Sequence, residues 1–384
     1  MTLLQQLGQA GALRTLDHAL AQSLRRLDPD TPDEVLAAAA LASLAVANGH
    51  AGFDLGEPQR LVDAAIDWPA PDAWRAALTA SRWVATPDTG NAESAVDAPL
   101  VYEHGLLYLR RYREYERRLA LGLRRIGGHA VAPRDSACLS PLFARLFPGE
   151  SLPSSTADAA RTTGNAAPAP DLQAQAATTT LGHNLVLITG GPGTGKTTTT
   201  ARLLVLLVAQ ALQAGAPASR IALAAPTGRA AERMAESVRK AVHALINAGV
   251  DATLLGNLPL AGTTLHRLLG TIPDSPRFRH HADNPLPFDV VVVDEASMID
   301  LPLMAKLVEA VADGARLVLL GDPDQLPSVE AGDVLAGILR AAKGDGSAPV
   351  GAATGGELFP PESIATTGDL FEPPPPLRNT VPAR

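Results

Sequence analysis

A glycine-rich octapeptide is the segment of this sequence whose residue types and spacing point most directly to chemistry. It reads GGPGTGKT and satisfies the pattern G-x-x-x-x-G-K-[ST]. Glycines let successive backbone N–H groups turn inward around phosphates, and the helix that follows adds a partial positive charge. Lys196 would then reach the β- and γ-phosphates, and the Thr197 hydroxyl would ligate Mg²⁺. The predicted phosphate site comprises Gly190, Gly191, Pro192, Gly193, Thr194, Gly195, Lys196, Thr197 and Thr198.

Two adjacent acids form a second candidate element. Asp294 and Glu295 follow four valines, Val290–Val293, whose branching and length favour a buried strand. Ligands of α/β sheets bind at the carboxyl ends of the strands, where these acids would lie. Asp294 can hold the Mg²⁺ shell, and Glu295 can orient and activate an attacking water. Such a pair also occurs at plain helix starts, but the phosphate loop earlier in the chain favours the catalytic interpretation.

Three further segments are candidates, and two of them, GDPDQLP and PTGRAA, follow predicted strands. Gln325, in GDPDQLP, can lie near the γ-phosphate, although an Asp-Pro turn is the simpler alternative. Thr227 and Arg229, in PTGRAA, can contact a nucleic-acid backbone from a helix N-terminus, or Thr227 can serve only as a helix cap. Thr264 and His266, in TLHRLL, give the weakest signal, because a lone histidine beside leucines is usually a packing or surface residue.

The element pattern predicts how these segments are positioned. Helical patterns at 198–214 and 230–248 separate short branched apolar runs that suit buried parallel strands. Alternation of strand and helix is typical of an α/β domain with a parallel sheet flanked by helices. The four apolar runs are 185–189, 221–225, 290–293 and 317–320.

The chain divides into four predicted segments. Residues 1–147 read as a helical N-terminal domain, in which leucines from Leu3 to Leu27 recur at intervals near 3.6. Residues 148–170 are rich in Ser, Thr, Ala, Pro and Gly and read as a linker. Residues 171–340 form the α/β domain, and residues 341–384 read as a disordered tail.

Composition excludes several classes of protein. With 46% hydrophobic and 19% charged residues, the chain suits a globular protein and not wholesale disorder. Its single cysteine, Cys138, and the absence of a signal-peptide pattern predict a cytoplasmic protein, and no apolar run is long enough to span a bilayer. The net charge of −8 argues only weakly against nucleic-acid binding, because positive charge can be confined to one groove.

The segment 102–125 interleaves arginines with tyrosines, and its role stays open at this point. It suits a nucleic-acid or partner-protein face. A solvated helix face whose tyrosines pack inward is the more common origin of such a pattern.

The motifs, in their order and spacing, resemble a known family. The segments GGPGTGKTTT, LAAPTGRAAERM, TLHRLLG, VVVDEASMIDLPLM and VLLGDPDQLPSVEAGDVL resemble motifs I, Ia, Ib, II and III of superfamily 1 DNA helicases. Within that superfamily the sequence resembles the RecD family, the α subunits of the RecBCD enzyme (exodeoxyribonuclease V). The segments NGHAGFDL at 48–55 and LLYLRRY at 106–112 resemble that family's N-terminal region.

The resemblance implies a fold and a function. It implies a RecA-like ATPase domain that binds ATP and Mg²⁺ and moves 5′-to-3′ along single-stranded DNA in double-strand break repair and recombination. Gln173 would contact adenine, and Gln325 would couple the γ-phosphate to motion. The N-terminal region would dock on RecB-like and RecC-like subunits acting at double-stranded DNA ends. Strand contacts would come from Thr227, Arg229, Thr264 and His266.

The sequence departs from the family's pattern after Leu339. The family continues into a second RecA-like domain that carries motifs IV to VI and the arginine completing the ATP site, and nothing after Leu339 resembles it. We therefore expect these 384 residues to correspond to the first part of such a protein. Two alternatives stay open, a stand-alone helicase of the same kind and a non-catalytic subunit that binds nucleotide without turnover.

Overall fold

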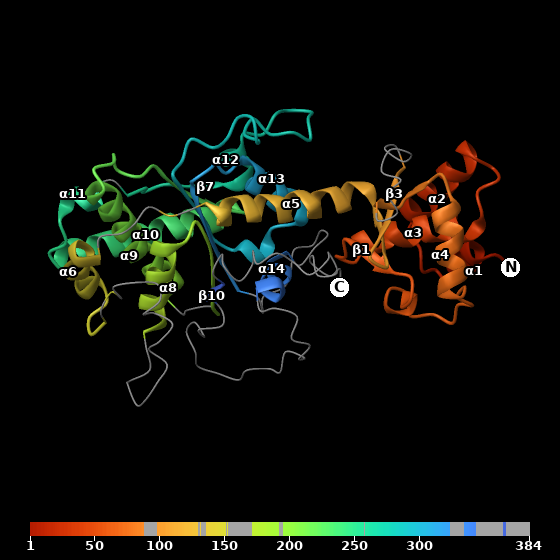
Figure 1. The fold of residues 1–384 in the computed structure, drawn as a ribbon, viewed down its shortest axis with the longest axis horizontal. Helices are drawn as coiled ribbons and strands as arrows, with labels where there is room; N and C mark the ends of the chain where they lie inside the picture. The colour runs from red at the N-terminus through yellow and green to blue at the C-terminus, as the bar shows by residue number, and fades with distance from the viewer. Residues whose placement is uncertain are drawn as a thin grey trace.

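The computed structural model of the protein describes residues 1–87, 98–129, 131, 136–150, 152, 171–191, 195–256, 258–322, 334–342 and 364–365. These residues form a small N-terminal unit and a larger unit built around a parallel sheet, with the long helix α5 (Arg110–Gly128) between them (Figure 1). Among the described helices, none is long and apolar enough to cross a membrane.

Helix α3 (Asp33–Ala47) is the centre of the N-terminal unit, and every residue from Val35 to Ala45 on it is buried. Its many alanines let neighbouring elements approach closely on all sides. Three helices pack in this unit, and Trp74 of the last donates its indole N–H to the Glu34 carbonyl at 3.0 Å. They are α1 (Leu3–Gln9), α2 (Thr15–Leu27) and α4 (Pro71–Ala80).

The leucine spacing predicted helix from Leu3 to Leu27, and the structure divides that run into two helices. The division falls at residues 10–14, where Gly11 has a φ of +64° that other residues adopt only with strain. The apolar side of both helices still faces α3, since Leu7 and Leu24 are buried in the same core. The predicted apolar face is therefore present in part, with a turn in its middle, while Leu16 and Leu27 of the predicted run are exposed.

The N-terminal unit also contains a small sheet, which the mostly helical prediction for residues 1–147 did not include. Its four strands lie in the order β1 (Gly52–Asp54), β4 (Leu106–Leu109), β3 (Leu100–Glu103) and β2 (Val84–Ala85), and the short 3-10 helix η1 is Pro58–Arg60. Strands of two to four residues are too short to give a period-2 signal that would stand out from the helical background.

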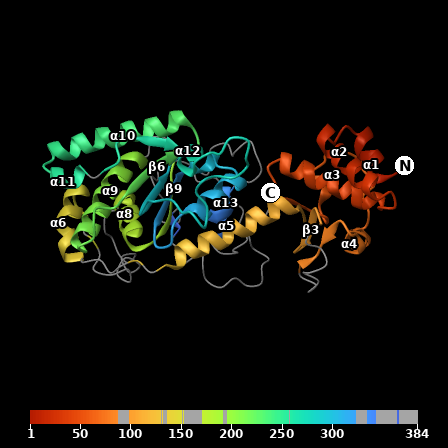
Figure 2. The same cartoon turned by 90° about the horizontal axis from the view of Figure 1, so that it is seen from above.

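Helix α5 connects the two units and packs along α13 (Leu301–Ala310), and Figure 2 shows the two helices side by side from above. Gly122 permits this approach, because a Cβ there would collide with the Val308 side chain. Arg125 donates to the carbonyls of Val308 at 2.9 Å and Val311 at 2.7 Å, at the C-terminal end of α13. A cation there satisfies unpaired carbonyls and the helix dipole.

A six-stranded sheet forms the core of the larger unit and confirms the predicted parallel α/β fold. All its pairings are parallel except the two-residue edge pairing of β10 with β5. In order across the sheet the strands are β10 (Ile364–Ala365), β5 (Leu185–Thr189), β9 (Arg316–Gly321), β8 (Val290–Val293), β6 (Ile221–Ala225) and β7 (Gly262–Thr264).

Both faces of the sheet are covered, as the unbroken apolar runs predict. Along β8, Val290 and Val292 face one core, and Val291 and Val293 face the other. The first layer contains α6 (Ser136–Leu146), α8 (Leu172–Gly182), α9 (Lys196–Gln213), α10 (Gly228–Asn247) and α11 (Ala252–Leu255). The second contains α5, α12 (Leu265–Leu269), η3 (Ala296–Met298), α13 and α14 (Val334–Ala342).

The packing of residues 110–147 bears on the predicted domain boundary at residue 147. Leu139 and Phe143 of α6 lie in the same core as α9 and the sheet, and α5 packs on α13. We therefore propose that the N-terminal unit ends near Arg110. Most of the predicted linker and tail, 148–170 and 341–384, lies outside the described residues.

Candidate functional site

The glycine-rich segment joins β5 to α9 at the carboxyl edge of the sheet. The Gly190 N–H donates to the Gly321 carbonyl at 3.2 Å, and Gly195 precedes α9 with a left-handed φ of +81°. The Lys196 ammonium contacts the Gly190 carbonyl and lies 3.4 Å from that of Gly191. The lysine side chain is therefore directed toward the end of β5, and its phosphate contact stays a prediction.

The described residues include only part of the predicted phosphate site. Thr198 is exposed on the first turn of α9, while the Thr199 and Thr200 hydroxyls donate to backbone carbonyls one turn back, at 3.0 Å and 2.8 Å. Pro192, Gly193, Thr194 and the side chain of Thr197 lie outside the described residues. Their phosphate and metal contacts stay predictions.

Gln173 lies against the phosphate loop, where the sequence predicted a nucleotide contact. Asp171 caps α8 by accepting the Gln173 N–H at 2.8 Å, which fixes the start of the helix. The Gln173 amide nitrogen is only 2.6 Å from where a Cβ on Gly195 would stand, and the φ of +81° at Gly195 favours glycine there. Arg202 of α9 donates to the amide oxygen at 3.3 Å. Sequence reasoning missed Arg202, because its contact depends on how α8 packs on α9.

Asp294 and Glu295 follow β8 at the same edge of the sheet, close to Lys196. Burial raises the pKa of Asp294, and the nearby Glu295 charge adds to the rise, whereas the Glu295 N–H at 2.9 Å and the Lys196 charge oppose it. A buried carboxylate that is disfavoured by desolvation gains from a hard cation, so Asp294 fits a Mg²⁺ ligand. Among the described residues no cluster of three metal-ligating His, Cys, Asp or Glu side chains occurs.

Glu295 has an unusual backbone and a partner that the sequence did not reveal. Its φ of 53° and ψ of 43° are left-handed, a conformation that costs a non-glycine residue about 1–2 kcal/mol. Its carboxylate forms an ion pair with Arg233 of α10, where the Glu295 side chain is 16% exposed and the arginine 65%. No local pattern predicts this pair, because 62 positions separate its members.

The residues predicted to contact single-stranded DNA lie at or just after the ends of β6 and β7, which are neighbours in the sheet. Ala225 of β6 pairs with Thr264 of β7, so the loops after both strands are adjacent. Thr227 and Thr264 each cap the helix that follows, accepting backbone N–H groups at 3.2 Å and 3.3 Å. The capping alternative therefore accounts for both hydroxyls, and strand contact stays a proposal.

Two of the residues predicted to contact single-stranded DNA, Arg229 and His266, are exposed at this edge of the sheet. Arg229 extends from the first turn of α10, and no ion pair for it occurs within the described part of the chain. His266 packs edge-on against Phe278, with ring centroids 5.8 Å apart. Gln325 lies outside the described residues, which end locally at the buried Asp322 after β9.

The arginines of segment 102–125 are largely engaged within the protein. Arg113 binds Glu103 at 2.8 Å, Arg117 and Arg118 both bind Glu114, and Arg125 caps α13. These ion pairs favour the interpretation of a charged helix face over that of a nucleic-acid surface.

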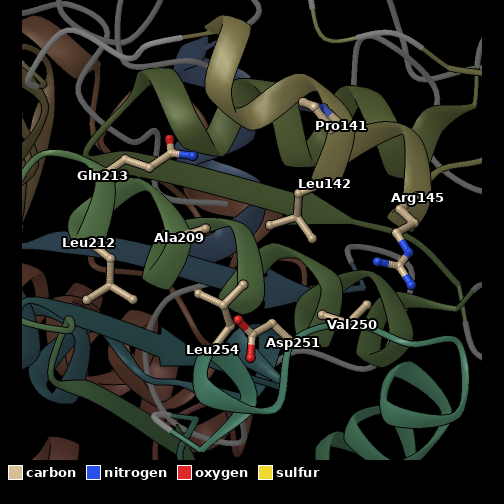
Figure 3. Close-up of a pocket in the computed structure, with 9 residues that line it drawn as sticks. All are labelled: Pro141, Leu142, Arg145, Ala209, Leu212, Gln213, Val250, Asp251 and Leu254. Carbon is tan, nitrogen blue, oxygen red and sulfur yellow. The ribbon is translucent and has the colours of Figure 1, made fainter.

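An apolar cavity of about 460 Å³ lies at the opposite end of α9 from the phosphate loop. Figure 3 shows Leu142 and Leu212 directed toward it, with Arg145 and Asp251 at its border. Since α9 runs for about 27 Å, the cavity is separate from the nucleotide site. Its lining is Pro141, Leu142, Arg145, Ala209, Leu212, Gln213, Val250, Asp251 and Leu254.

A parallel sheet with a glycine-rich phosphate-loop motif and the acids Asp294 and Glu295 at its carboxyl edge is typical of P-loop nucleotide-binding domains. Family models match two regions, an "AAA domain" at residues 173–331 and the "RecBCD enzyme subunit RecD, N-terminal domain" at 9–108. Over most of its length the chain is therefore similar to RecD subunits.

Individual relatives agree with this assignment. The chain is 42% identical over 332 residues to the RecBCD enzyme subunit RecD of Mycobacterium tuberculosis (strain CDC 1551 / Oshkosh), covering 86% of this chain and 51% of the relative. It is 41% identical over 161 residues to the ATP-dependent RecD2 DNA helicase of Deinococcus radiodurans, covering 42% of this chain and 18% of that one. The chain thus spans about half the length of its mycobacterial relative.

A solved structure also matches, the crystal structure of Bacteroides Pif1 bound to ssDNA. Sequence identity is 28% with a TM-score of 0.21, and the match covers 38% of this chain and 30% of that one. A TM-score this low supports no argument from geometry.

Proposed function

We propose that this chain supplies the first motor domain and the docking unit of a RecD-type helicase subunit. The complex would be RecBCD-like and would process double-stranded DNA ends in double-strand break repair and recombination, in the cytoplasm. One observation carries this assignment. Lys196, Asp294 and Glu295 meet at the carboxyl edge of the sheet, next to the capped loops after β6 and β7.

ATP and Mg²⁺ are the proposed ligands. The loop glycines would donate N–H groups to the phosphates, Lys196 would neutralise the β- and γ-phosphates, and Gln173 would contact adenine. Thr197 and Asp294 would hold Mg²⁺, which when bound screens the negative charge of the phosphates. Arg202 supports the base contact, because its bond to the Gln173 oxygen holds that side chain at the loop.

Hydrolysis would depend on Glu295. A carboxylate beside the γ-phosphate can accept a proton from the attacking water, and Lys196 can stabilise the charge that develops on the phosphate oxygens. The strand would lie across Thr227, Arg229, Thr264 and His266, so that ATP-driven movement of this edge would advance single-stranded DNA in the 5′-to-3′ direction. Gln325, which follows β9 in the sequence, would report the state of the γ-phosphate.

The N-terminal unit would dock on RecB-like and RecC-like subunits. The family match at residues 9–108 supports a complex subunit over a stand-alone helicase, since the match to the RecD2 helicase spans only 42% of the chain. If this subunit were non-catalytic, it would still bind nucleotide, but ATP turnover by the complex would not depend on Glu295.

The test is reconstitution with RecB-like and RecC-like subunits. We expect single-stranded DNA to stimulate ATP turnover of the complex, with Glu295→Gln abolishing the contribution of this subunit while ATP still binds. Lys196→Ala should weaken ATP binding itself. A complex in which both variants unwind and hydrolyse as the parent does would refute the motor function.

A further inference from the structure

The proposed base, Glu295, and the proposed strand contact, Arg229, are connected through one side chain. Arg233 lies on α10 one turn beyond Arg229, and residues four apart share a helix face. From that face Arg233 forms its ion pair with Glu295. A single guanidinium therefore links the helix that begins at the predicted strand-contact loop to the acid pair after β8.

The ion pair is asymmetric in its surroundings. The Glu295 side chain is 16% exposed, whereas that of Arg233 is 65% exposed and accessible to a ligand. The left-handed backbone of Glu295 and the bond from its N–H to Asp294 fix the direction in which its Cα–Cβ bond leaves the chain. The acid is thus held in place, and the arginine can change partner.

A phosphate is a suitable replacement partner. Guanidinium groups bind phosphate and carboxylate through the same planar pair of N–H donors. A DNA phosphate bound at the N-terminus of α10 by Arg229 would lie within one helical turn of Arg233. Arg233 can therefore bind the carboxylate or the phosphate, and the two compete for it.

We propose that Arg233 is a positioning residue that occupies the Glu295 carboxylate until a DNA phosphate displaces it. While paired, Glu295 has fewer lone pairs with which to accept a hydrogen bond from a water. When DNA takes Arg233, the carboxylate is released for hydrolysis. This inference rests on the proposed function, because it requires DNA at α10 and a catalytic role for Glu295.

Binding of single-stranded DNA without ATP tests the exchange directly. Because the two ligands compete, Glu295→Gln should release Arg233 and tighten binding of a fluorescent oligothymidylate by roughly two- to five-fold, the range of exposed ion pairs. The slope of log affinity against log salt should steepen by about 0.7, the value for one additional phosphate contact on a single strand.

Matched variants separate this exchange from a general change in charge. Glu232→Gln removes an acid from the same helix, whose partner is Arg239 at 2.8 Å, and should not steepen the salt slope. In an Arg233→Ala background, Glu295→Gln should leave both affinity and slope unchanged. In an Arg233→Lys background, Glu295→Gln should produce part of the gain in DNA affinity and slope, because lysine keeps the charge and loses the paired donors.

The outcomes are distinct. If the parent binds DNA and Arg229→Ala weakens binding, but Glu295→Gln alters neither affinity nor slope, the exchange is refuted and the proposed function stands. An equal gain from Glu295→Gln with and without Arg233 also refutes it. If the chain shows no affinity for the oligonucleotide at low salt, the proposed DNA contacts are wrong, and the proposed exchange is refuted with them.

Discussion

Glu116 is the buried acid whose titration should be visible in the stability of the protein. It lies on α5, next to the N-terminal sheet, and is 5% exposed, with one carboxyl oxygen lacking a hydrogen-bond partner. Burial raises its pKa to about 8, and the Glu103 charge adds to the rise, while its hydrogen bond with Tyr108 and the Arg113 charge oppose it. The folded state therefore favours the protonated carboxyl.

The sign and size of the effect follow from that pKa. In the unfolded chain the carboxyl titrates near its ordinary value of 4.5, so the folded state holds the proton more tightly. Its contribution to stability is complete below pH 4.5, decreases as pH rises, and is lost above about 8. Each tenfold step in proton binding is worth about 1.4 kcal/mol, so the loss between pH 6 and pH 9 is on the order of 3 kcal/mol.

Tryptophan fluorescence provides the assay, because Trp68, Trp74 and Trp83 all lie in the N-terminal unit. Guanidinium unfolding at pH 6 and pH 9 should show this loss in the parent, and Glu116→Gln, which cannot ionise, should remove it. Glu114→Gln is the control, because two arginines lower the pKa of Glu114 to about 2 and it stays ionised throughout. An unchanged pH dependence in Glu116→Gln would refute the reasoning.

Four further outcomes are expected. Lys196→Ala should lose affinity for Mg·ATP in calorimetry while remaining folded, and undiminished affinity would contradict the phosphate site. Deletion of residues 1–109 should abolish co-purification with RecB-like and RecC-like subunits but spare ATP binding, and retained co-purification would exclude the docking assignment. Gly122→Ala should destabilise the protein by about 1–3 kcal/mol in chemical unfolding through its clash with Val308, whereas Gly128→Ala, with open space around it, should not; equal effects would count against close packing of α5 on α13. If the arginine that completes the ATP site lies in a second domain, as the resemblance implies, ATP turnover by the isolated 384 residues should be about 10³- to 10⁵-fold below that of a complete site, and DNA-stimulated turnover of several per second would disprove this.

The sequence predicted those parts of the site that depend on local order along the chain. A glycine-rich loop, a strand and the acids behind it are each continuous, and parallel pairing brings their carboxyl ends to one edge without further information. Lys196 and Asp294 could therefore be placed together from pattern alone. The apolar runs also predicted four of the strands, because strands covered on both faces show no polar alternation to obscure them.

What the sequence did not predict depends on packing between distant segments. The Arg233–Glu295 pair and the Arg202–Gln173 bond need the relative positions of helices, which no spacing encodes. The small N-terminal sheet has strands of two to four residues, below the length at which alternation is informative. The boundary that we propose near Arg110 differs from the predicted one at residue 147, because α5 and α6 are helical like the preceding unit and only their packing sets them apart.

The strand order has a consequence for how the protein is made. Strand β5, which leads into the phosphate loop, pairs in parallel only with β9, the last of the five parallel strands to be synthesised. During translation the edge of β5 therefore waits, with its backbone groups unpaired, until Arg316–Gly321 leaves the ribosome. Such long-range pairing forms slowly, and meanwhile the unpaired backbone groups of β5 can pair with another chain. Nascent chains that end before Arg316 are therefore expected to aggregate. Synthesis of β9 sets the earliest point at which the chain can be released with β5 paired.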